Sequence, residues 1–204
     1  MRTMKTTLVL IAGKAGAGKT TVSQMLRDKI NIDYPDLFVE RYSFANPIKF
    51  IAQAFMGWDK EKDDKGRKLL QDLGRIGREY NENVWVKHLL NQMNKNFGNK
   101  NQIFPTNIVI VDDWRFPNEL AYLKGNPVID VFTVRVFGRG GLEGDTAFDV
   151  SENSLPEVDT QIIETNLDGD HWYDSQIENN QDLELLDVNV KLLMRSIAKQ
   201  YIVE

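Results

Sequence analysis

Short apolar runs and longer stretches with helical periodicity take turns along the chain. Apolar or alternating runs predict strands at 6–12, 37–45, 108–111, 128–137 and 161–165. Apolar positions at helical spacing predict helices after the first strand and over 67–80, 83–96, 117–124 and about 181–201. Because strands separated by helices pair in parallel, the pattern predicts an α/β fold whose parallel sheet is covered on both faces.

Composition narrows this picture to an ordinary globular protein. The 204 residues are 42% hydrophobic and 27% charged, which suits one sizeable core, so we expect a single domain over 1–204. The net charge of −5 argues against stable binding to nucleic acid or to an anionic membrane. Cysteine is absent, which excludes disulfides, thiolate metal sites and a catalytic thiol. The apolar run Leu8 to Ala12 is too short for a membrane span or a secretory signal, so we expect a cytoplasmic location.

The turn after the first strand carries the most informative motif. Residues 13–20 have the sequence GKAGAGKT, a complete G-x-x-x-x-G-K-[ST] between an apolar strand and a helix. Glycines there let successive backbone N–H groups converge on a phosphate, and the helix N-terminus adds positive charge. The lysine neutralises phosphate oxygens, and the threonine hydroxyl joins a Mg²⁺ shell. We therefore expect triphosphate contacts from Gly13, Lys14, Ala15, Gly16, Ala17, Gly18, Lys19, Thr20 and Thr21.

A triphosphate-binding loop does not by itself name a reaction. The N-K-x-D motif with which GTPases bind their base is absent, and ATPase motors normally need a longer chain. At this length, a kinase of small molecules is the first candidate.

The segment 69–80 is the first candidate for a second substrate site. On a helix, Gln71, Arg75 and Arg78 follow i, i+4, i+7, on the side opposite an apolar stripe formed by Leu69, Leu73, Ile76 and Tyr80. Gly74 and Gly77 cost this helix about 2 kcal/mol relative to alanine, which close approach of a ligand or another backbone would offset. The segment is either an anion site built from guanidiniums or a solvated basic face.

The strand 108–111 ends in two acids, as in proteins where a carboxylate supports Mg²⁺ beside a phosphate loop. Asp112 and Asp113 are not both expected to face the phosphates, because successive side chains of a strand alternate faces. Arg115 follows at once, either as a partner of Asp113 or as a contact to substrate.

Together these segments resemble the deoxynucleoside monophosphate kinases typical of bacteriophages, a branch of the P-loop nucleotide kinases. The matching segments are GKAGAGKT (13–20), SFANPIK (43–49), LLQDLGRIGREYNENVW (69–85), VDDWRFPNE (111–119) and, more weakly, SENSL (151–155). The resemblance implies a three-layer P-loop fold with a five-stranded parallel sheet. It also implies ATP with Mg²⁺ as phosphoryl donor and a deoxynucleoside 5′-monophosphate as acceptor.

The resemblance also implies roles for individual residues. Lys19 and Thr20 would contact the ATP phosphates, Thr20 and Asp113 would support Mg²⁺ partly through water, and Arg78 and Arg115 would contact the transferring phosphates. A helical insertion over about 50–100 would bind the acceptor, and Arg139 would close over both substrates from a short lid at about 138–150. The acceptor-binding set is Phe44, Lys49, Gln71, Arg75, Arg78, Trp85 and Arg115, with Pro47 beside it. In this chain Arg75 stands where many relatives have a small polar residue. A second acid, Asp112, directly precedes Asp113.

Other groups have simpler structural interpretations. Asp168, Asp170, His171 and Asp174 lack the spacing of a zinc site and are interpreted as a polar turn. Trp85 and Tyr80 would either stack on a base or pack in the core. Two alternatives stay open for the function: a kinase of another small phosphorylated metabolite, or a non-catalytic ATP-binding accessory module. The bases accepted, a homodimer and a viral or prophage origin are not determined by the sequence.

Overall fold

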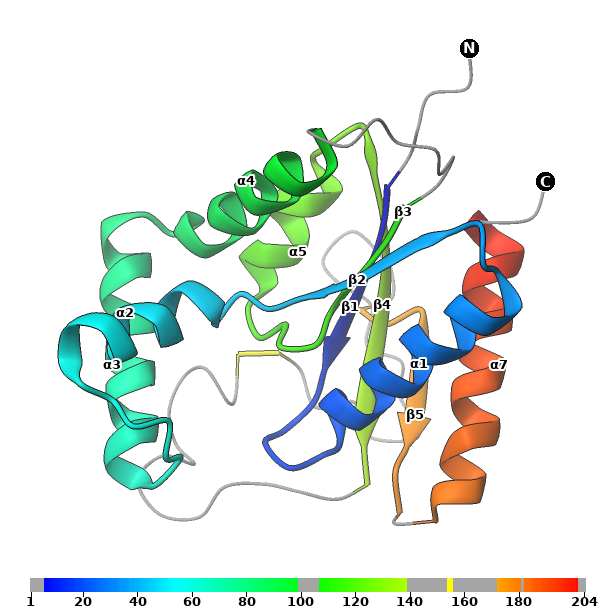
Figure 1. Ribbon diagram of the computed structural model, residues 1–204, viewed down its shortest axis with the longest axis horizontal. Helices are drawn as coiled ribbons and strands as arrows, with labels where there is room; N and C mark the ends of the chain where they lie inside the picture. Colours follow the sequence, from blue (N-terminus) through cyan, green and yellow to red (C-terminus); the bar gives the residue numbers. More distant parts are fainter. Residues whose placement is uncertain (1–5, 99–106, 139–153, 156–171, 181, 202–204) are drawn as a thin grey trace.

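A five-stranded parallel sheet forms the centre of the computed structural model, which describes residues 6–98, 107–138, 154–155, 172–180 and 182–201 (Figure 1). The strand order is β2-β3-β1-β4-β5, and all four neighbouring pairs are parallel. The strands are β1 (Thr6–Ala12), β2 (Phe38–Tyr42), β3 (Asn107–Val111), β4 (Ile129–Phe137) and β5 (Ser175–Glu178). The predicted α/β class and the five-stranded parallel sheet are confirmed.

Helices cover both faces of the sheet. They are α1 (Lys19–Asp33), α2 (Asn46–Met56), α3 (Asp64–Tyr80), α4 (Val84–Gly98), α5 (Pro117–Lys124) and α7 (Leu183–Tyr201). In Figure 1, α1 and α7 lie together on one side of the sheet, whereas α2, α3 and α4 gather on the other. The three helices α2 to α4 occupy the region where the sequence predicted a helical insertion.

Alternate residues of the central strands enter two separate cores. Val9 and Ile11 of β1 pack with α1 and α7, while Leu8 and Leu10 pack with α2, α4 and α5. Strand β1 is buried at every position after Thr6, which explains its continuous apolar run. The sheet is therefore a rigid platform whose carboxyl edge carries the loops.

Three sequence predictions need correction. Helix α2 was not predicted: Pro47 does not merely close a strand but lies in the first turn of a helix, which its fixed φ favours. The strand predicted at 161–165 lies outside the described residues, and the fifth strand of the sheet is Ser175–Glu178. The apolar stripe predicted on α3 is only partly buried: Leu73 packs against the core, whereas Ile76 is 54% and Tyr80 90% exposed.

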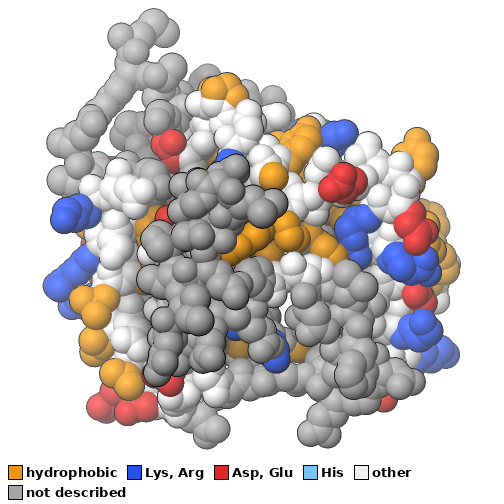
Figure 2. Space-filling view, turned by 180° about the vertical axis from the view of Figure 1, so that it is seen from behind, with side chains coloured by type: hydrophobic (Ala, Val, Ile, Leu, Met, Phe, Trp, Pro, Cys, Tyr) orange, Lys and Arg blue, Asp and Glu red, His pale blue; other side chains and the backbone are white. Residues whose placement is uncertain are grey.

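Mixed charge marks the surface seen in Figure 2, where Lys and Arg side chains lie mainly towards the edges, with acidic side chains among them. Among the described helices, none combines the length and the apolar character that crossing a bilayer requires.

Candidate active site

All the candidate site segments lie at one edge of the sheet. Because the strands are parallel, the segments that follow them emerge together at their carboxyl ends. Residues 13–18 follow β1, 43–45 follow β2, 112–116 follow β3 and 179–180 follow β5. Ligands of open α/β folds bind at this edge, so the topology brings the predicted donor and acceptor segments to the same region.

The phosphate loop is held tightly against β4. Gly13 has a φ of 149°, and a Cβ at this position would lie 2.3 Å from the backbone oxygen of Val136. Only glycine fits such a position, because both the backbone conformation and the space exclude a side chain. Gly18 has a φ of 96° and directly precedes the first turn of α1. Both glycines therefore have a conformational reason to occupy these positions.

The Lys19 ammonium lies over its own loop. Its Nζ donates hydrogen bonds to the backbone oxygens of Gly13, at 2.5 Å, and Lys14, at 2.8 Å. Thr20 and Thr21, at the start of α1, are exposed to solvent. The Lys19 ammonium is thus partly buried and lies along the loop. When a phosphate binds, its oxygens would replace the two backbone oxygens as hydrogen-bond partners of the ammonium.

Asn179 is a contact to this loop that sequence reasoning missed. Its side chain is 1% exposed, and its Nδ2 donates to the backbone oxygen of Ala17 at 2.8 Å. The backbone N–H of Asn179 donates to Phe137, so the residue ties the end of β5 to β4 and to the loop. Its buried Oδ1 has no hydrogen-bond partner among the described residues. Sequence reasoning could have found Asn179 only by predicting β5 with its correct bounds, because Asn179 is the residue that directly follows this strand.

The two acids after β3 have different partners. Asp112 accepts hydrogen bonds from Ser23 of α1, at 2.9 Å, and from Arg41 of β2, at 2.6 Å. Ser23 also donates to the backbone oxygen of Thr20, which links Asp112 to the first turn of α1. Asp112 therefore lies on the phosphate-loop side of the edge.

Asp113 instead holds the segment after β2. One carboxylate oxygen accepts from the Ser43 hydroxyl at 2.6 Å and from the Ala45 N–H at 2.9 Å, and the other accepts from the Phe44 N–H at 2.9 Å. These hydrogen bonds fix the start of α2. Both carboxylates already have partners: Asp112 has the Arg41 guanidinium and the Ser23 hydroxyl, and Asp113 has the 43–45 segment. Asp112 is the one that is linked to α1 and so to the phosphate-loop side.

The donor set on this side suits Mg²⁺. The Thr20 hydroxyl and the Asp112 carboxylate are hard oxygen ligands, and Mg²⁺ commonly uses one or two carboxylates, with water and substrate phosphates completing its shell. Within the described parts of the chain, no cluster of three acidic or histidine side chains forms a dedicated metal cage. The residues therefore fit an ion that arrives with a triphosphate.

Arg78 reaches the same edge from the last turn of α3. Its guanidinium carbon lies 4.0 Å from the centre of the Phe116 ring. A Cβ at Gly74 would lie 3.3 Å from Nη1 of Arg78, so this glycine leaves room for the guanidinium. Of the three polar residues predicted on one face of α3, Arg78 is the one whose contacts place it beside the 112–116 segment.

Gly77 and Trp85 have a structural explanation. A Cβ at Gly77 would lie 2.2 Å from the indole of Trp85, and Trp85 Nε1 donates to the backbone oxygen of Gly74 at 3.0 Å. Trp85 is 8% exposed and belongs to the core beneath α3 and α4. The close approach that offsets the cost of Gly77 is therefore a tryptophan, and the base-stacking role predicted for Trp85 is not supported by its place in the core.

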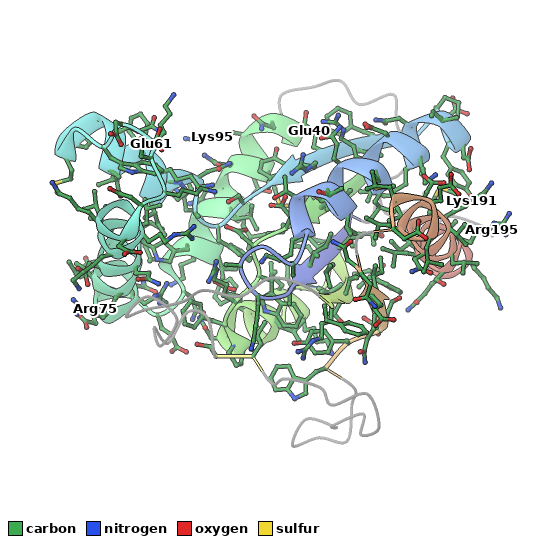
Figure 3. All side chains as sticks on the ribbon, turned by 90° about the horizontal axis from the view of Figure 1, so that it is seen from below. Glu40, Glu61, Arg75, Lys95, Lys191 and Arg195 are labelled. Atoms are coloured by element: carbon green, nitrogen blue, oxygen red, sulfur yellow. The ribbon has the colours of Figure 1, made fainter. Side chains whose placement is uncertain are left out.

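Arg75 points away from the site. Its guanidinium pairs with Glu79 at 2.7 Å and with Asp72 at 3.4 Å on the surface of α3. Figure 3 shows it on the outer side of that helix. These surface ion pairs raise the pKa of Arg75, the largest cause being the hydrogen bond to Glu79. Arg75 was predicted to bind the acceptor because it was placed on one face of α3 with Gln71 and Arg78; Gln71, half-buried, lies nearer the core side.

Arg115 and Phe116 are held by a buried acid. Glu119, 4% exposed, accepts the backbone N–H groups of both residues at 3.0 Å and so caps α5. Burial raises the pKa of Glu119 to about 8, against the lowering effect of these two hydrogen bonds. The carboxyl group therefore fixes the turn between Asp113 and α5.

The remaining predicted residues fall into two groups. Phe44 is 4% exposed in the core, so its backbone N–H, and not its ring, faces the edge; Lys49 lies half-buried on α2. Arg139 and most of the predicted lid lie outside the described residues, as do Asp168, Asp170 and His171. Asp174 binds the backbone N–H and the hydroxyl of Thr133 at 2.7 and 2.8 Å, in line with the structural interpretation of that segment.

Comparison with known proteins supports the resemblance over part of the chain. Over 85 residues, 40% of the chain, it is 33% identical to the deoxynucleoside-5′-monophosphate kinase of Escherichia phage T5. That stretch covers 34% of the phage enzyme, so the chain matches about a third of the length of this curated relative. The chain matches no protein-family model.

Solved structures with a similar backbone fold share little sequence identity with this chain. The thymidylate kinase of Ehrlichia chaffeensis gives a TM-score of 0.45 at 14% identity, covering 94% of this chain and 99% of that one. The APS kinase of Mycobacterium tuberculosis gives 0.44 at 10% identity, covering 94% and 96% of the two chains. At these scores the likeness carries no argument about activity. The fold assignment stands on the strand order and the phosphate loop, and the chain resembles a phage deoxynucleoside monophosphate kinase.

Proposed function

We propose that the protein transfers the γ-phosphoryl group of ATP to a deoxynucleoside 5′-monophosphate, giving the diphosphate and ADP. The observation that carries this proposal is the pairing at one sheet edge of a phosphate loop with Arg78, an arginine delivered by a separate helix. The partial match to the phage enzyme supplies the acceptor class.

On the donor side, the chain would bind the triphosphate of ATP and neutralise its charge. The backbone N–H groups of 14–18 and the start of α1 would hold the β-phosphate, and Lys19 would exchange its contacts with Gly13 and Lys14 for phosphate oxygens. Thr20 and Asp112 would hold Mg²⁺, partly through water. When bound with ATP, the ion would neutralise charge on the triphosphate oxygens.

On the acceptor side, the chain positions an anion that is already a nucleophile. Arg78 and Arg115 would bind the monophosphate, and its oxygen would attack the γ-phosphorus in line as the bond to the ADP oxygen breaks. A phosphate oxygen carries negative charge at neutral pH, so no side chain needs to remove a proton. Orientation and positive charge are then the main contributions of the protein.

A panel of acceptors tests this proposal. ADP release from ATP and Mg²⁺ is measured with each common deoxynucleoside monophosphate, with its ribose counterpart, and without acceptor. We expect release with at least one deoxynucleotide and poorer use of the matched ribonucleotide. A 2′-hydroxyl buried without a partner costs about 1–3 kcal/mol, which corresponds to roughly a tenfold to hundredfold preference.

Each of the other outcomes has a meaning. Equal or better use of the ribonucleotides would remove the deoxy preference and leave the kinase. Release only with a different phosphorylated metabolite would favour that alternative, and ATP binding without acceptor-dependent release would favour a non-catalytic module.

A further inference from the structure

Arg78 and Phe116 meet from segments far apart in the sequence. Arg78 is in the last turn of α3, and Phe116 directly precedes α5. At 4.0 Å from guanidinium carbon to ring centre, the cation lies on the ring face. The negative face of an aromatic ring attracts a cation in this geometry. The contact therefore orients the guanidinium as well as packing it.

The backbone of Phe116 has little freedom. The backbone oxygen of Phe116 accepts a hydrogen bond from Nε1 of Trp114, at 2.9 Å, and its N–H donates to Glu119 at 3.0 Å. Trp114 is 1% and Glu119 4% exposed, so both partners are anchored in the core. With both backbone groups of Phe116 bound to buried side chains, the backbone from which the ring projects is held in place.

Helix α3 limits the guanidinium as well. A Cβ at Gly74 would approach Nη1 of Arg78 to 3.3 Å, and the backbone oxygen of Gly74 accepts a hydrogen bond from Trp85. The guanidinium therefore lies over the Phe116 ring and close to Gly74. Its N–H donors lie in its own plane, which is the direction in which they bind phosphate oxygens.

We propose that Phe116 is a positioning residue that orients Arg78 toward the acceptor monophosphate. This inference rests on the proposed function, because Arg78 must be an acceptor contact for it to hold. A free arginine side chain loses about 2 kcal/mol of rotamer entropy when it is fixed, and a side chain ordered before binding loses less at that moment. The ring would thus lower the KM for the acceptor and not that for ATP.

The test compares Phe116→Leu, which keeps an apolar side chain but removes the aromatic face, with Phe116→Tyr, which restores it. For Phe116→Leu we expect kcat/KM for the acceptor to fall about threefold to tenfold, with the KM for ATP and the thermal midpoint close to wild type. Phe116→Tyr should behave as wild type. In an Arg78→Ala background, Phe116→Leu should have no further effect on the acceptor, because the ring acts through Arg78.

Three outcomes would overturn the inference. If Arg78→Ala weakens acceptor use while Phe116→Leu does not, the inference fails and the proposed function stands. If Phe116→Leu costs the same in the Arg78→Ala background, or impairs ATP equally, the ring is only a packing element; Phe116→Met repeats the test should the leucine variant not fold. If the wild-type protein uses no monophosphate, the proposed function fails and this inference fails with it.

Discussion

The donor and acceptor sides of the sheet edge are built differently. On the donor side, one continuous segment, 13–20, supplies the loop, the lysine and the threonine, and Asn179 supports it from β5. On the acceptor side, Arg78, the 43–45 segment and residues 113–116 come from three separated parts of the chain. A contiguous motif such as 13–20 can be recognised from neighbouring residues alone. A site assembled from distant segments depends on how the helices pack.

The adjacent acids Asp112 and Asp113 stand at the boundary between the two sides. Asp112 contacts α1 through Ser23, and Asp113 contacts the segment before α2 through Ser43 and two backbone N–H groups. Because neighbouring side chains leave a strand end in different directions, two residues of the same type take different partners. The variants below separate the two sides.

The largest effect is expected on the donor side. Lys19→Ala should lower kcat by at least about a hundredfold, because it removes a charge that would stabilise the transferring phosphates. Folding should change little, since the ammonium binds exposed or partly buried backbone oxygens of its own loop and not the core. Steady-state kinetics measures the loss, with Lys191→Ala, an exposed lysine of α7 (Figure 3), as the matched control. Near-normal turnover of Lys19→Ala would refute the assignment.

On the acceptor side, two arginines of one helix form a matched pair. Arg78→Ala should weaken transition-state stabilisation with the monophosphate by about 2–3 kcal/mol, as expected for a lost charge-assisted contact, and ATP binding should change much less. Arg75→Ala removes the same charge from the outer face of α3 and should leave kinetics unchanged. If Arg75→Ala were the more damaging variant, the placement of α3 would be wrong.

The two acids should separate by their effect on the Mg²⁺ requirement. Asp113→Asn disrupts hydrogen bonds from the Ser43, Phe44 and Ala45 donors and should lower the free energy of unfolding by about 1.5–3 kcal/mol, the range for bonds to a charged group. Asp112→Asn leaves these bonds in place but weakens the ion pair with Arg41, so it also lowers stability; in addition it should raise the Mg²⁺ concentration needed for activity. Urea unfolding and Mg²⁺ titration measure the two effects; identical profiles would contradict the division of roles.

The last expected effect concerns pH. Burial raises the pKa of Glu119 to about 8, whereas the unfolded carboxyl titrates near 4.5. Between these values the folded state keeps a proton that the unfolded state has released, so the Glu119 contribution to stability falls as pH rises and levels off above about pH 8. Glu119→Gln cannot titrate. Its stability relative to wild type should therefore increase from pH 5 to pH 8, and a constant difference in urea unfolding would contradict the assignment.

Local sequence signals predicted much of the fold. The continuous apolar run of β1, the phosphate loop and α5, whose observed bounds are Pro117–Lys124, all follow from neighbouring residues. Strand β5 was not predicted because its four residues, SQIE, carry a single buried apolar position, Ile177.

The acceptor side was predicted less well, for a physical reason. The side of α3 that faces the core carries Gly74 and Gly77, which make room for Arg78 and Trp85, beside the half-buried Leu70 and Leu73. Hydrophobic periodicity therefore selected Ile76 and Tyr80, which are exposed, and placed Arg75 and Arg78 on one functional face. Only the packing of α3 against α4 and residues 114–116 separates the two arginines.

The destination of the γ-phosphoryl group tests the central claim most directly. The protein is incubated with Mg²⁺, ATP labelled in its γ-phosphate and a mixture of the common deoxynucleoside monophosphates, and the labelled products are separated. The account predicts label in a deoxynucleoside diphosphate, formed only when the monophosphate is present and lost with Lys19→Ala. Label in inorganic phosphate alone, or ATP consumption that does not depend on the acceptor, would contradict it.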